Sequence, residues 1–78
     1  MELKPKYARG WLNLGISHAN LGKYDLAARS YLKALDLNNN ASHIWSYLRI
    51  SFSCLERKDL LAKAESQNID LFRDEFLR

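Results

Sequence analysis

Apolar residues recur along the chain at spacings of three and four positions, which is typical of helices with one buried face. One such stripe comprises Ala27, Tyr31, Ala34 and Leu35. A second stripe comprises Ile44, Trp45, Leu48, Phe52 and Leu55. This periodicity predicts an all-α fold, with helices over about residues 6–20, 24–37, 43–55, 59–66 and 69–76. Leu71, Phe72 and Phe76 give the last of these an apolar side.

Helix-breaking and capping residues place the ends of these helices. Pro5 suits the first turn of the first helix, where its missing N–H has no partner to lose. Gly22 is expected to end that helix, because glycine readily adopts the left-handed conformation of a helix C-terminus. Residues 38–40 are three asparagines that break the second helix. Ser42 and Asn68 are expected to be the N-caps of the third and the last helix.

The chain also repeats itself. Trp11 and Trp45 are 34 residues apart, as are Leu14 and Leu48. The order of large and small residues resembles the tetratricopeptide repeat, a helix-turn-helix unit of the same period that stacks into superhelical arrays. The residues that carry this resemblance are Trp11, Leu14, Gly15, Ala27, Tyr31 and Ala34.

The repeat divides the chain into three parts. Residues 1–5 read as the tail of a preceding repeat, 6–39 as one complete repeat, and 40–78 as C-terminal capping helices. The second repeat starts and then departs from the pattern: Arg49 replaces the glycine, and positions 61, 65 and 68 hold Leu, Glu and Asn. Because repeat arrays end in atypical units, we expect a C-terminal helical bundle and a chain that is a piece of a longer array.

Composition excludes several classes of function. A hydrophobic content of 47% indicates a packed chain, and one cysteine, Cys54, permits no internal disulfide. The sequence has neither a long apolar run nor a secretory signal, so we expect a cytoplasmic protein. The net charge of +3 comes from residues 1–37, but no basic cluster accompanies it, so we expect no nucleic-acid partner.

No residues form the pattern of an enzyme or of a metal or cofactor site. His18 and His43 are far apart in sequence and neither belongs to a metal-spaced pair. His18 falls at a packing offset of the first helix, and Cys54 lacks a nucleophile signature. We therefore expect no catalysis, no metal and no cofactor.

The first helix carries the candidate site. At about 100° per residue from Arg9, Asn13 lies near 40° and Asn20 near 20°. The expected packing residues Trp11, Leu14, Gly15 and His18 fall between about 140° and 240°, on the opposite side.

First helices line the concave binding surface of such arrays. There, arginine can bind a carboxylate, and asparagine can donate to and accept from a peptide backbone. The ordinary alternative is a solvated helix face, on which polar residues are common.

The residues resemble a more specific family, the receptors for the type 1 peroxisomal targeting signal. The resemblance rests on Arg9, on Asn13-Leu14-Gly15-Ile16-Ser17 with Asn20, and on the segments 44–54, 57–59 and 68–76. By this resemblance Arg9, Asn13 and Asn20 bind the C-terminal backbone of a Ser-Lys-Leu-type signal. The implied partners are cargo proteins with that signal and, in a full-length receptor, docking proteins of the peroxisomal membrane.

The resemblance implies a cytoplasmic receptor that cycles to that membrane and imports cargo into the peroxisome matrix. The repeats that complete the ligand site in the family are absent here, so we expect the chain alone to bind the signal weakly or not at all.

Two alternatives stay open at this point. A generic co-chaperone-like repeat would hold an acidic C-terminal peptide, but it would prefer lysine clamps, and the first helix offers only Lys6. An assembly scaffold would use exposed repeat faces to associate. Self-association of the chain is possible in either case, and light scattering over a concentration series tests it.

Overall fold

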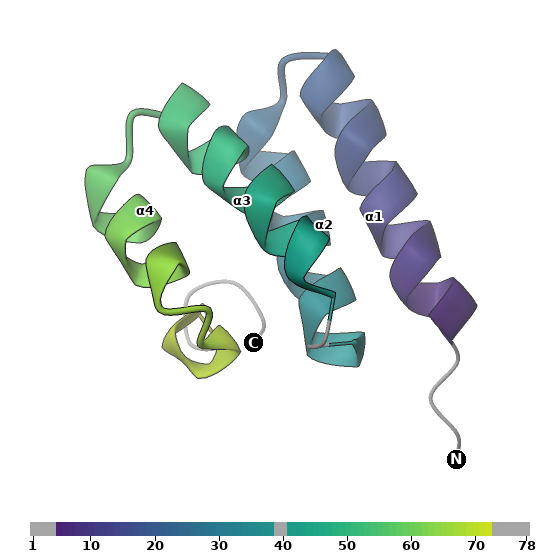
Figure 1. Ribbon diagram of the computed structural model, residues 1–78. Helices are drawn as coiled ribbons and strands as arrows, with labels where there is room; N and C mark the ends of the chain where they lie inside the picture. Colours follow the sequence, from purple (N-terminus) through teal and green to yellow (C-terminus); the bar gives the residue numbers. More distant parts are fainter. Residues whose placement is uncertain (1–4, 39–40, 73–78) are drawn as a thin grey trace.

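The computed structural model describes residues 5–38 and 41–72, and throughout these ranges the chain is helical or in short turns (Figure 1). The α-helices are α1 (Pro5–Asn20), α2 (Tyr24–Leu37), α3 (Ser42–Cys54) and α4 (Lys58–Glu65), followed by the 3-10 turn η1 (Ile69–Phe72). The all-α prediction is confirmed, and the bounds of the four α-helices agree with the predicted ones to within one residue. The predicted last helix is only the η1 turn in the described part, and the remainder of that prediction, with Phe76, lies outside it.

The helices pack as consecutive antiparallel pairs. In Figure 1, α1 and α3 run side by side in front of α2, which packs against both of them. Helix α4 turns back along α3, and η1 reaches α2. Consequently α2 is the central helix, and its residues Ala27, Ala28, Leu32, Ala34 and Leu35 are completely buried.

The two helix pairs share their boundaries. Helices α1 and α3 end at Asn20 and Cys54, and α2 and α4 begin at Tyr24 and Lys58, each pair 34 residues apart. Both turns close with the same hydrogen bonds: Lys23 N–H donates to the His18 carbonyl over 2.8 Å, and Arg57 N–H to the Phe52 carbonyl over 3.1 Å. Such bonds need a left-handed residue just after the helix.

The left-handed residue differs between the two turns. Gly22 has φ 78° in the first turn, as predicted, whereas Glu56 has φ 58° in the second. A side chain is strained in this conformation. The second turn therefore copies the geometry of the first without its favourable residue.

Gly15 sets the distance between α1 and α2. A Cβ at this position would lie 2.5 Å from Cε1 of Tyr31 and 3.2 Å from the carbonyl oxygen of Ala27. Tyr31 is buried on Gly15 and stacks on Tyr47 of α3, with 5.7 Å between the ring centroids. Burial raises the pKa of Tyr31, and Tyr47 adds to this shift.

Three local predictions are wrong. Leu14 was expected to pack in the core but is 43% exposed, because α1 turns a different face toward α2. Ser42 does not cap α3: the cap position is Ala41, and no side chain makes a cap hydrogen bond there. Leu71 is exposed, whereas Phe72 is buried. The Asn68 prediction is supported, since its Oδ1 accepts a hydrogen bond from the Asp70 N–H over 3.0 Å.

The C-terminal elements are held to α3 by aromatic packing. Phe72 is completely buried, and its ring centroid lies 5.7 Å from that of Phe52 and 6.1 Å from that of Trp45. Helix α4 contributes Leu60 and Ala64 to the core instead of the repeat offsets 61 and 65. The second helix pair thus departs from the repeat by a change in which face of α4 is buried.

Candidate binding surface

The predicted site residues Arg9, Asn13 and Asn20 all lie on α1 and are all exposed. In the described residues their side chains make no hydrogen bond or ion pair with the chain. Their donors and acceptors are therefore available to a ligand. The structure contains no ligand, so their role stays a prediction.

The position of this polar stripe on α1 differs from the predicted one. The residues of α1 that pack on the core, fully or in part, are Ala8, Trp11, Leu12, Gly15, Ile16 and Ala19. On the wheel measured from Arg9 they centre near about 270°, so the stripe is adjacent to the packing face rather than opposite to it. Arg9, Asn13 and Asn20 consequently lie along the edge of α1 that borders α3.

A small cavity lies at the Arg9 end of this edge. It has a volume of about 160 Å³ and is lined by residues of α1, of the end of α2 and of the start of α3. Arg9 lines its rim, and the buried residues Ala8 and Ile44 form part of its wall. No carboxylate is among its lining residues in the described ranges. An anionic group could enter this cavity without meeting a like charge.

At the other end, Tyr24 of α2 lies against the end of α3. A hydrogen bond with the side chain of Cys54 raises the pKa of Tyr24, and the charge of a deprotonated Cys54 would act in the same direction. Cys54 itself is a free, exposed thiol. This contact holds α2 and α3 together near Asn20, and it gives Cys54 a packing role consistent with the sequence prediction.

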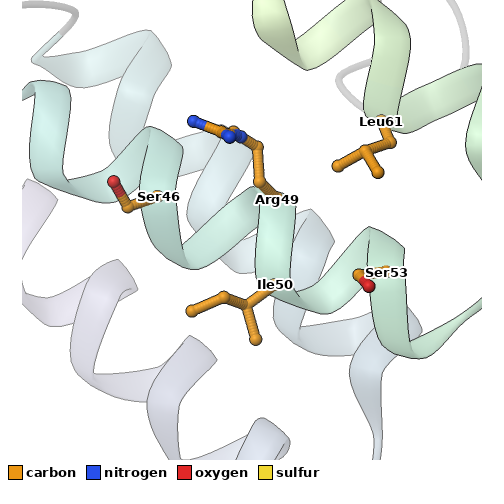
Figure 2. A pocket seen from close by; sticks show the side chains of 5 residues that line it. All are labelled: Ser46, Arg49, Ile50, Ser53 and Leu61. Carbon is orange, nitrogen blue, oxygen red and sulfur yellow. The ribbon is translucent and has the colours of Figure 1, made fainter.

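A larger hollow of about 380 Å³ lies elsewhere, between α3 and α4. Figure 2 shows Ser46, Arg49, Ile50 and Ser53 along α3, with Leu61 reaching in from α4. It contains none of the predicted site residues.

The four α3 residues of this hollow stand 34 positions after Leu12, Gly15, Ile16 and Ala19, which pack in the core. The polar replacements, with Arg49 in place of glycine, leave open the position at which α3 would receive a further helix.

Two other classes of site were searched for in the described part of the chain. Residues 5–38 and 41–72 contain no group of three or more His, Cys, Asp or Glu side chains that could hold a metal ion. None of the helices in these ranges is both long and apolar enough to cross a membrane.

Comparison with known proteins places the chain in a family context. The family model of the tetratricopeptide repeat matches residues 8–40. The chain is 34% identical over 97% of its length to a peroxisomal targeting signal receptor of Kluyveromyces lactis. It is 33% identical over 97% to one of Candida albicans, and 32% identical over 90% to one of Yarrowia lipolytica.

The chain spans only 16%, 15% and 14% of the lengths of these three relatives. No solved structure matches the chain significantly.

Proposed function

The chain contains a tetratricopeptide repeat and is related over nearly its whole length to peroxisomal targeting signal receptors, and from this premise we propose that it is a peptide-binding module of such a receptor. Its ligand is the C-terminal Ser-Lys-Leu-type signal of cargo proteins. Arg9 binds the terminal carboxylate, and Asn13 and Asn20 bind the peptide backbone. The module carries out no reaction.

The observation that carries this proposal is the unpaired polar edge of α1. Arg9 offers a planar set of N–H donors that fits a carboxylate, and each asparagine offers both a donor and an acceptor. The three side chains follow one edge of a single helix, which matches the straight path of an extended peptide. A site with one wall in this chain is expected to bind weakly by itself.

The remaining parts of the proposal follow from the relationship to these receptors. Residues 6–39 form the complete repeat that carries the site, and residues 40–78 form the capping helices that support its C-terminal side. In the whole protein, the module would bind cargo in the cytoplasm and travel with it to docking proteins at the peroxisomal membrane.

A titration of the chain with a peptide ending in Ser-Lys-Leu tests the proposal. Because weak binding is expected, the reporter is the set of backbone amide NMR signals, followed to millimolar peptide. Substituting Arg9→Ala should weaken binding by at least about tenfold, since a hydrogen bond to a charged group contributes roughly 1.5–3 kcal/mol. Asn13→Ala should weaken it by about three- to tenfold.

The control variant is Arg29→Ala, which removes the same charge from an exposed position of α2. It should leave the affinity within about twofold, because only a distant charge is lost. Equal affinities of the Arg9→Ala and Arg29→Ala variants would exclude Arg9 as the carboxylate partner.

A further inference from the structure

The cavity at the junction of α1, α2 and α3 has a second nitrogen donor facing Arg9. His43, in the first turn of α3, lines this cavity together with Arg9 and Asn38. His43 is exposed and makes no hydrogen bond or ion pair in the described residues. An imidazole ring carries at least one N–H in either of its protonation states. Three side chains from three helices therefore bring nitrogen donors to one small cavity.

The repeat explains why these two residues face one cavity. His43 stands 34 positions after Arg9, so it occupies on α3 the place that Arg9 occupies on α1. Because α1 and α3 run side by side, the corresponding edges of the two helices border the same surface (Figure 1). The sequence dismissed His43 because it lacks a metal-spaced partner. Its relation to Arg9 becomes evident only when both the period and the packing are known.

The lower wall of the cavity is apolar. Ala8, Ala41 and Ile44 are at most 7% exposed, and Leu12 completes the wall. A cavity of about 150 Å³ can hold a molecule of the size of benzene, so one of about 160 Å³ suits a single aliphatic side chain. The combination of nitrogen donors at the rim and an apolar wall below fits a carboxylate next to an aliphatic group.

We propose that this cavity receives the C-terminal aliphatic residue of the peptide, with its α-carboxylate held between Arg9 and the His43 ring. This inference rests on the proposed function and extends it, since it adds a binding residue on α3 and a location for the last side chain. Asn38 is the third donor at the rim. Asp36 is nearby on α2 but does not line the cavity, so the carboxylate meets no acidic side chain among the lining residues.

The test compares matched histidine variants in the same NMR titration, with the peptide as free acid and as C-terminal amide. His43→Ala should weaken binding of the acid by about three- to tenfold, the effect of one lost hydrogen bond. His18→Ala, which removes the other histidine from α1, should change it by less than about twofold. The amide should bind at least about tenfold more weakly than the acid.

A smaller probe tests the location directly. N-acetyl-leucine should shift the backbone amide signals of Arg9, Ala41, His43 and Ile44, whereas N-acetyl-leucinamide should not. Thermal unfolding of each variant, followed by circular dichroism, establishes that it is folded.

The outcomes separate the two proposals. If Arg9→Ala weakens peptide binding and His43→Ala does not, the inference is wrong and the proposed function stands. Unmoved cavity signals with N-acetyl-leucine likewise overturn the inference alone. If neither the acid nor the amide binds, or if Arg9→Ala is without effect, the proposed function fails and the inference fails with it.

Discussion

At the scale of single residues, Gly15 is the position at which the packing of α1 on α2 is most constrained. Substituting Gly15→Ala forces a Cβ against the ring of Tyr31 and the backbone of Ala27. Tyr31 is buried and stacked on Tyr47, so it cannot move freely. We expect a loss of about 1–3 kcal/mol in the free energy of unfolding, measured by urea denaturation.

Gly10 provides the matched control for this substitution. It lies in the same helix, and a Cβ there would meet nothing within 4 Å. Gly10→Ala should therefore raise the stability by about 0.5–1 kcal/mol, the usual gain in an exposed helix interior. If both substitutions changed the stability equally, close packing at Gly15 would not be the reason for its glycine.

Glu56 is a second position where a single residue decides the local energy. Its left-handed backbone is costly for a residue with a side chain, and glycine would remove that cost. Part of the gain is lost because glycine has more freedom in the unfolded chain. Glu56→Gly should raise the free energy of unfolding by about 0.5–1 kcal/mol in the same denaturation experiment.

The corresponding substitution in the first turn runs the other way. Gly22→Ala places a side chain at φ 78°, so it should lower the stability by about 1 kcal/mol. A stability decrease in the Glu56→Gly variant would show that the glutamate contributes an interaction that outweighs its backbone strain.

At the scale of helices, the sequence predicts the elements well and their orientations less well. The 34-residue period and the turn residues are local signals, so the bounds of α1 to α4 could be found from the sequence. The rotation of α1 could not, because it depends on which neighbours are present. Leu14 fits a repeat packing position, yet it is 43% exposed, since the described part of the chain has no helix against that side.

The polar stripe of Arg9, Asn13 and Asn20 could be found from the sequence for the same local reason: the three residues share one edge of one helix. The contribution of α3 could not be found in this way. His43 reaches the cavity only because α2 holds α1 and α3 side by side, which is a tertiary relationship.

The C-terminal elements depend on one aromatic contact. Phe72 joins η1 to Trp45 and Phe52 of α3 and is completely buried. Phe72→Ala should lower the free energy of unfolding by about 3–5 kcal/mol, as is usual for a buried phenylalanine. The neighbouring Leu71 is 45% exposed, so Leu71→Ala should cost less than about 1 kcal/mol. Circular dichroism during thermal unfolding measures both, and similar losses would contradict the anchoring role of Phe72.

At the scale of the whole molecule, the chain is one helical repeat closed on one side by a modified second unit. The polar residues Ser46, Arg49 and Ser53 of α3 replace small and apolar residues of α1, which explains why the pattern of the repeat does not continue past α3 in its original form. On the other side, Leu14 and Leu21 of α1 leave apolar surface exposed. The binding surface lies between these two ends, along the edges of α1 and α3.

The most direct test of this account observes the side-chain amides of the asparagines themselves. With ¹⁵N-labelled asparagine, the NH₂ signals of Asn13 and Asn20 should shift saturably when a peptide ending in Ser-Lys-Leu is added. The signal of Asn68, whose oxygen is bonded to the Asp70 N–H, should stay in place. If the Asn13 and Asn20 signals remain unmoved while other signals of the chain report peptide binding, the peptide does not lie along α1 and the account is wrong.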